Sequence, residues 1–141
     1  MDINGIAHIQ LSVRDFPRSR AFYHRLLHEC FGMTVLVDIP EMFYCIGGRT
    51  GVAISPVDPE FQDVPFHQRR AGLHHLCFRA RSREDVDELY GVVQDLGATV
   101  VRAPEETGWA PGYYSMLFED PDGMRLEINH VPGKGHLPGG A

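Results

Sequence analysis

The chain has 141 residues and a formal net charge of −6, with 43% hydrophobic and 23% charged residues. This composition is that of an ordinary globular protein, and the length suits one domain or two small modules. Basic residues do not cluster, which argues against nucleic acid or an anionic membrane surface as a partner. No apolar run approaches the ~18 residues of a membrane span, and the N-terminus lacks a signal-peptide pattern. Three cysteines without a CxxC spacing indicate reduced thiols in a cytoplasmic protein.

The chain carries an internal repeat of low sequence identity. "GIAHIQLSVRDF" at residues 5–16 aligns with "GLHHLCFRARSR" at 72–83, so that Gly5 falls on Gly72 and His8 on His75. Each copy reads as a strand, a helix and three further strands. We therefore predict a single domain over residues 5–130. Its two modules span residues 5–56 and 72–130, residues 57–71 link them, and residues 131–141 form a C-terminal tail.

The first module begins with alternating residues at 6–13, which predict a strand. Asp15 is placed to cap a helix from Phe16 to Cys30, whose apolar residues Phe22, Leu26 and Leu27 form a partial stripe. Three further strands are predicted near 33–38, 42–47 and 51–56.

The second module repeats this order. Ser82 and Asp85 form a capping box, and the spacing of the following apolar residues predicts a helix with one buried face that ends at Gly97. That face consists of Val86, Leu89, Tyr90, Val93 and Leu96. Three strands are predicted near 98–102, 112–119 and 123–130.

Alternation along the strands selects three side chains as metal ligands. On the first strand, His8 shares a face with Gln10 and Ser12, away from the helix. The tandem His74-His75 is expected to split between the two faces, with His75 on the open face beside Cys77 and Arg79. Glu127 takes the same face of the last strand. If the modules curl toward each other, two imidazoles and one carboxylate form a ligand set suited to Fe(II), Mn(II) or Zn(II).

Three segments of the sequence resemble the vicinal oxygen chelate superfamily, which includes glyoxalases, bleomycin-resistance proteins and extradiol dioxygenases. They are "HIQLSVRDFPRSRAFY", "GLHHLCFRA" and "FEDPDGMRLEI". The resemblance covers roughly residues 5 to 130. It implies an α+β fold in which paired βαβββ modules form a cup-shaped mixed sheet around a metal-binding cavity. Carried over by position, the metal ligands are His8, His75 and Glu127, in agreement with the alternation.

The resemblance also shows two departures. Glyoxalase I-type members take a fourth ligand from the last strand of the first module, and the matching position here is assigned to Ser55, a poor ligand. Extradiol dioxygenases keep a tyrosine that acts as an acid catalyst about one strand-length before the ligand glutamate. The matching position here is Leu117. Tyr113 shares the parity of Leu117, so it is the candidate catalytic residue, whereas Tyr114 is expected to pack outward.

The sequence leaves three functions open. The first is a metal-dependent dioxygenase acting on a catechol- or enol-like compound, with Fe(II) as the cofactor. The second is a glyoxalase-like lyase or isomerase using Zn(II), Mn(II) or Ni(II). The third is a non-catalytic small-molecule binding or resistance protein, which the retained ligands disfavour.

The predicted substrate pocket draws on both modules: Gln10, Ser12, Ser55, Cys77, Arg79, Tyr113 and Arg125. The expected partners are a small-molecule substrate and a second copy of the chain in a homodimer. Pairing of the modules within one chain or across a dimer stays open, because both arrangements bury the same surfaces.

Overall fold

The computed structural model describes residues 1–3 and 5–133. The chain divides into two compact units, Met1–Pro65 and Phe66–Ala141, and each is described by itself. Most of the predicted tail, residues 134–141, lies outside the described residues. Among the described residues, no helix is both long and apolar enough to cross a membrane. The three cysteines, Cys30, Cys45 and Cys77, form no disulfide in this part of the chain.

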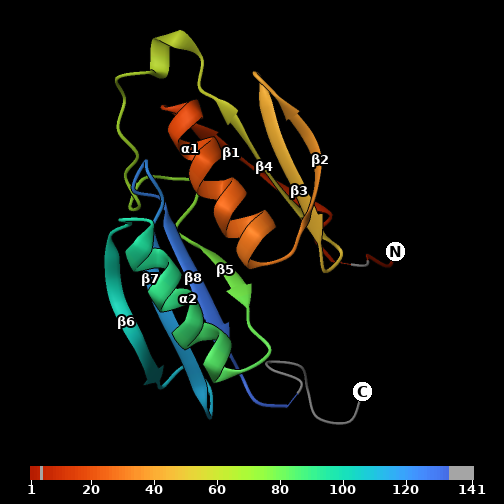
Figure 1. Ribbon diagram of the computed structural model, residues 1–141, viewed down its shortest axis with the longest axis vertical. Coiled ribbons are helices and arrows are strands. Elements are labelled where there is room, and N and C mark those ends of the chain that lie inside the picture. Colours follow the sequence, from red (N-terminus) through yellow and green to blue (C-terminus); the bar gives the residue numbers. More distant parts are fainter. Residues whose placement is uncertain (4, 134–141) are drawn as a thin grey trace. The chain divides into compact units, whose positions relative to one another are not determined.

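The first unit is a four-stranded sheet with a helix packed on it (Figure 1). Its elements are β1 (His8–Val13), α1 (Phe16–Tyr23), a π-helical segment (His24–Cys30), β2 (Thr34–Ile39), β3 (Met42–Gly47) and β4 (Thr50–Pro56). The strand order is β1-β4-β3-β2, with β1 and β4 parallel and the other pairs antiparallel. A short 3₁₀ helix, Pro59–Phe61, follows β4.

The second unit repeats that architecture. Its elements are β5 (Leu76–Arg79), α2 (Arg83–Asp95), β6 (Val100–Thr107), β7 (Tyr113–Glu119) and β8 (Arg125–His130). The strand order β5-β8-β7-β6 matches that of the first sheet, again with one parallel pair. The predicted α+β class with βαβββ units is thereby confirmed. The arrangement of the two sheets as one cup stays a prediction.

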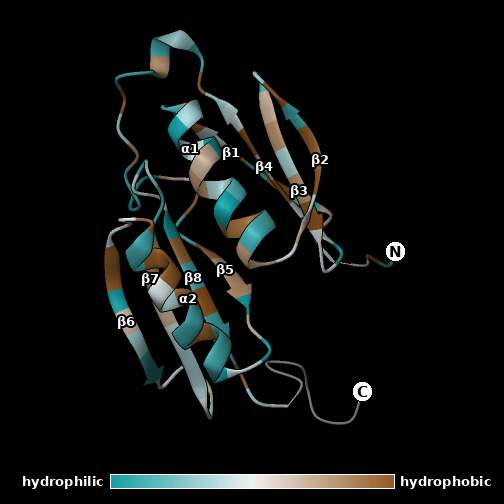
Figure 2. Cartoon of the chain, in the orientation of Figure 1, coloured by the Kyte–Doolittle hydropathy of each residue, from teal (hydrophilic) through white to brown (hydrophobic). Residues whose placement is uncertain are grey.

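Local sequence explains why α2 forms and which face of the sheet it covers. Ser82 Oγ accepts from the backbone N–H of Asp85, and the Asp85 carboxylate accepts from the backbone N–H of Ser82, as the predicted capping box requires. The helix then buries Val86, Leu89 and Val93 against β6, β7 and β8. Figure 2 shows β6 hydrophobic near its start and hydrophilic toward its end, while half-buried and exposed residues alternate along most of the strand, as expected when one face is covered. The other face of the sheet is left open for a site.

Two elements differ from the sequence prediction. The helix predicted to run from Phe16 to Cys30 is α-helical only to Tyr23 and then widens into the π-helical segment. Leu26 and Leu27 of this segment are both fully buried. Strand β6 extends to Thr107 instead of ending near residue 102, because it is an edge strand, where Pro104 and register shifts are tolerated.

Candidate functional site

Glu127 lies at the centre of the open face of the second sheet. Its backbone pairs with Leu117 on β7 and with Cys77 on β5, and only 7% of the residue is exposed. Its neighbours Leu126 and Ile128 are buried on the helix-covered face. A buried carboxylate is costly unless its oxygens have partners, so its contacts define the site.

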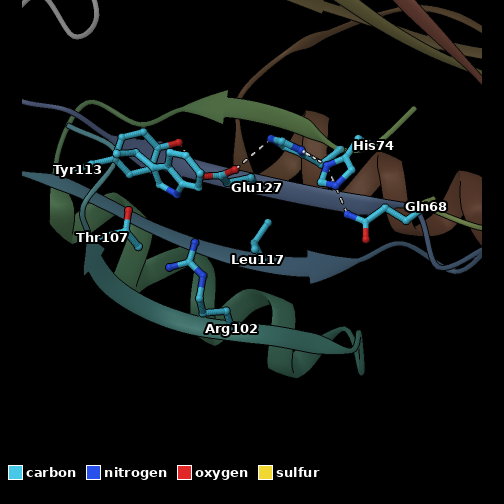
Figure 3. A pocket seen from close by; sticks show the side chains of 9 residues that line it. Gln68, His74, Arg102, Thr107, Tyr113, Leu117 and Glu127 are labelled. Carbon is cyan, nitrogen blue, oxygen red and sulfur yellow. Dashed lines mark hydrogen bonds and ion pairs between the residues drawn. The ribbon is translucent and has the colours of Figure 1, made fainter. Parts of the chain in front are cut away.

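Each oxygen of Glu127 has a partner. Tyr113 Oη donates to Oε1 at 2.7 Å, and Oε2 lies 3.3 Å from Nε2 of His75. Figure 3 shows the carboxylate with Tyr113 on one side and a chain of polar contacts leading to His74 on the other. The expectation that Tyr113 shares a face with Glu127 is confirmed. Tyr114 points to the helix face instead, where its hydroxyl donates to Asp87 of α2 at 2.7 Å.

The two adjacent histidines do not split between the faces as expected. His74 Nδ1 lies 2.8 Å from His75 Nδ1, and both rings line the same pocket. The expectation was wrong because β5 begins only at Leu76, so strand alternation does not apply to the bend before it. Gln68 Nε2 reaches His74 Nδ1 at 3.5 Å and extends the chain of contacts.

The spacing of His75 and Glu127 fits two ligands of one divalent ion. Metal–nitrogen and metal–oxygen bonds of about 2.1 Å at tetrahedral or octahedral angles place two donor atoms about 3.0–3.4 Å apart. The 3.3 Å between Nε2 and Oε2 falls in that interval. Within the described ranges, no three His, Cys, Asp or Glu side chains gather closely enough to form a complete metal site. The pair therefore needs a further donor, and His8 stays the predicted one.

His74 is placed to orient His75. A ligand bond through His75 Nε2 requires the tautomer with the proton on Nδ1, and that proton then points at His74 Nδ1. We expect His74→Ala to weaken metal binding about 10- to 100-fold, because the ring of His75 loses its support. Competition with a chelating dye measures the change.

A conservative variant supplies the control for this prediction. In His74→Asn, the side-chain oxygen can take the place of Nδ1 and accept the same proton, so most of the affinity is expected to return. Equal affinity in wild type and His74→Ala would show that His74 does not support the ligand.

Tyr113 is held in its protonated form. Burial of the phenol and its hydrogen bond to Glu127 both raise the pKa of Tyr113. The folded state thus holds this proton more tightly than the unfolded chain does. The resulting stabilisation is present below about pH 10, the unfolded pKa, and is lost as the pH rises further. At neutral pH the hydroxyl is a hydrogen-bond donor and not a base.

Removing this hydroxyl should destabilise the metal-free protein. We expect Tyr113→Phe to lower the free energy of unfolding by about 1.5–3 kcal/mol, the range for a hydrogen bond to a charged group, because Glu127 is then left buried with an unmatched oxygen. Urea unfolding measures it. The matched control is Tyr114→Phe, whose hydroxyl bonds the exposed Asp87 and should cost less than about 1 kcal/mol. Equal costs for the two variants would contradict the special role of Tyr113.

The pocket around these groups has a volume of about 530 Å³. Its lining residues all belong to the second unit: Gln68, His74, His75, Arg102, Thr107, Trp109, Tyr113, Leu117 and Glu127. Leu117 lies directly opposite Glu127, at the position where the dioxygenase pattern has its acid. Sequence reasoning missed Gln68, Arg102 and Thr107 as lining residues, since one lies in the predicted linker and the others on the irregular edge strand. Trp109, in the loop after β6, adds an aromatic ring to the lining.

Six of the seven predicted pocket residues lie outside this lining, and three of these six belong to the second unit. Cys77 shares the face of Glu127, but desolvation and the negative charge of Glu127 raise the pKa of Cys77 to about 12, so it stays a thiol at neutral pH. Arg125 is engaged by Glu119, with 3.0 Å between Nε and Oε1. Arg79 is exposed at the end of β5.

The predicted residues of the first unit share the open face of their own sheet. His8, Gln10 and Ser12 are exposed on β1, while Leu11 and Val13 on its other face are buried. Gln10 Nε2 donates to Ser55 Oγ at 3.1 Å. This confirms the predicted alternation on β1.

The strand register corrects the position assigned to a fourth ligand. Gln10 pairs with Ala53 on β4 in the way that its repeat partner Cys77 pairs with Glu127 on β8. Ala53, not Ser55, is therefore the counterpart of Glu127 in the first unit. Alanine has no donor atom, so the first unit offers His8 without a matching carboxylate.

Comparisons with known proteins agree with this architecture. Residues 5–128 match the Glyoxalase/Bleomycin resistance protein/Dioxygenase superfamily. The uncharacterized protein YqjT of Bacillus subtilis (strain 168) is 29% identical over 122 residues, which cover 86% of this chain and 94% of YqjT. Glutathione transferase FosA of Serratia marcescens is 28% identical over 127 residues, which cover 90% of this chain and 81% of FosA. The crystal structure of a glyoxalase-type protein from Bacillus halodurans superposes with a TM-score of 0.81 at 28% identity and covers 91% of this chain and 96% of that one.

Proposed function

Because the chain belongs to the Glyoxalase/Bleomycin resistance protein/Dioxygenase superfamily, we propose that it is a divalent-metal-dependent enzyme acting on a small oxygen-chelating substrate. The proposed ligands are His8, His75 and Glu127. The observation that carries the proposal is the buried carboxylate of Glu127, which Tyr113 holds from one side while His75 Nε2 stands 3.3 Å away on the other.

The metal and the residues of the pocket each have a proposed role. A divalent metal, when bound, supplies Lewis-acid polarisation of the substrate's oxygen atoms and, if it is Fe(II), a centre for reaction with O₂. Tyr113 fixes the carboxylate and holds a proton at Oη beside it, so it is the proposed acid. His74 fixes the tautomer of His75. Leu117 and Trp109 give the pocket apolar surface on which a flat substrate can lie.

Within this class, we favour oxygen-dependent cleavage of a catechol- or enol-like compound. A histidine pair with one carboxylate leaves coordination positions open for a chelating substrate and a second reactant, which is the arrangement of non-haem Fe(II) oxygenases. A glyoxalase-like proton transfer would need a base, and Ala53 stands where the first unit would supply a carboxylate. Tyr113, with its raised pKa, does not replace that base.

One observation favours a second candidate. FosA, which is similar to 90% of this chain, is a glutathione transferase. Addition of a thiol to a small metal-chelated electrophile would use the same ligands. In that case the thiol would come from a co-substrate, because Cys77 keeps its proton at neutral pH and lies outside the pocket lining.

The test starts with elemental analysis of protein purified without chelator. The sample is then loaded anaerobically with Fe(II), and oxygen consumption is followed with a panel of catechols. Parallel samples with Mn(II) or Zn(II) are given glutathione and a small epoxide, and loss of free thiol is followed. Iron content with catechol-dependent oxygen uptake supports the dioxygenase. Zinc, manganese or nickel content with thiol consumption replaces it by the transferase.

A further inference from the structure

The pocket holds a cation that the proposed metal chemistry does not use. Among the lining residues that the structure describes, Arg102 is the one with a permanent positive charge. Its side chain is 24% exposed. Figure 3 shows Arg102 on the same side of the sheet as Glu127, with Leu117 between them and Thr107 beside the guanidinium.

Strand register fixes how far Arg102 stands from the ligand carboxylate. Arg102 pairs with Leu117, and Leu117 pairs with Glu127, so the three residues form one row across β6, β7 and β8. Two strand spacings separate the backbones of Arg102 and Glu127 by roughly 10 Å. A molecule with one small ring fits between the two side chains. Register shifts lie on both sides of Arg102 along β6, and such bulges re-aim a side chain.

Hydrogen bonds hold the guanidinium of Arg102 in place but do not use all of its N–H donors. Nη2 donates to the buried Ser115 Oγ at 2.8 Å, and Nη1 donates to the Ser115 carbonyl at 3.4 Å and to Glu105 at 3.3 Å. These bonds engage three of its five N–H groups within the described residues, which leaves a two-donor fork of the kind that grips an oxyanion. The side chain of Glu105 is 57% exposed, so solvent screens its charge.

A second polar group in the pocket, the hydroxyl of Thr107, has unused hydrogen-bonding capacity. Thr107 Oγ1 is buried and has no hydrogen-bond partner among the described residues. It lines the pocket with Arg102. A buried hydroxyl without a partner is unfavourable, and an oxygen of a bound substrate would satisfy it.

We infer that Arg102 and Thr107 form a subsite for an anionic group, so that the substrate carries a carboxylate or a similar oxyanion at the end opposite its metal-chelating oxygens. This inference rests on the proposed function, because the metal neutralises Glu127, whose charge would otherwise repel an anion.

The test compares ligands that differ by one carboxylate. Protein loaded with Zn(II), which is not redox-active, is titrated calorimetrically with catechol, 2,3-dihydroxybenzoate and 3,4-dihydroxybenzoate. We expect one of the two acids to bind at least about 10-fold more tightly than catechol, from the strength of a hydrogen bond to a charged group. Arg102→Gln should abolish this preference and Arg102→Lys should retain part of it. The matched control Arg83→Gln, an arginine outside the pocket lining that pairs with Glu106, should keep it.

Thr107→Val gives a second readout that does not depend on folding of the Arg102 variants. It should weaken binding of the acid and leave the free protein as stable as wild type or more so, because a buried unpaired hydroxyl is removed. Binding of catechol and both acids with equal affinity, or a preference that survives Arg102→Gln, would overturn the subsite. Failure to take up metal would instead overturn the proposed function. The subsite would then be judged on metal-free Glu127→Gln protein, where it predicts tighter binding of benzoate than of benzyl alcohol.

Discussion

Replacing Glu127 with glutamine is expected to weaken metal binding at least ~10-fold while leaving the metal-free protein as stable as wild type or more stable. The loss of affinity follows because the one anionic donor of the proposed set becomes a neutral amide. The gain in the free protein follows from the surroundings of the side chain. The carboxylate is buried, and an amide keeps an oxygen to accept from Tyr113 and offers an N–H toward His75 Nε2.

Thermal unfolding with and without metal measures both the loss of metal affinity and the stability of the metal-free protein. At saturating metal, a 10-fold weaker affinity lowers the metal-induced stabilisation by about 1.4 kcal/mol. For a chain of this size, that reduces the shift in Tm by roughly 3–5 °C. Glu119→Gln is the control, because Glu119 is a partly buried carboxylate on the neighbouring strand that pairs with Arg125 outside the pocket. An unchanged metal-induced shift in Glu127→Gln would show that Glu127 is not a ligand.

Replacing either proposed histidine ligand with alanine is expected to abolish stoichiometric metal binding. His75→Ala removes the donor that stands 3.3 Å from Glu127. His8→Ala removes the donor that the repeat places at the equivalent position of the first unit. Two remaining ligands hold a divalent ion far more weakly than three, and we expect less than ~0.2 equivalents to stay bound after dialysis.

A third histidine controls for unspecific effects of this change. His67 is exposed, and its Nδ1 accepts from the backbone N–H of Arg69 at 3.1 Å. His67→Ala should therefore bind metal as wild type does. Loss of metal in His75→Ala but not in His8→Ala would remove His8 from the ligand set and require a different third donor.

Strand alternation is the part of the site that the sequence reveals most directly. A side chain's parity along a strand places it on one of two faces, and this rule put Glu127 and Tyr113 together on the second sheet. It also put His8 and Gln10 on the open face of the first. The capping box of α2 was equally readable, because it depends only on residues three apart.

The rest of the site depends on where strands begin and how they pair. His74 precedes β5, so its contact with His75 comes from a bend that alternation does not describe. Arg102 lies between two register shifts on an edge strand, where parity breaks down. Arg125 had the right parity for the pocket, but its neighbour across the hairpin, Glu119, engages it. Reassigning the first-unit counterpart of Glu127 from Ser55 to Ala53 likewise required the register of β4.

Metal titration of the wild-type protein tests the central claim most directly. Protein stripped with chelator is reconstituted anaerobically with Fe(II), Mn(II), Ni(II) and Zn(II) in turn, and the bound metal is counted after removal of the excess. Binding of about one equivalent per chain is the predicted result for a set of two histidines and one carboxylate. Less than ~0.2 equivalents with all four metals would contradict it, since such ligand sets bind tightly when they are complete.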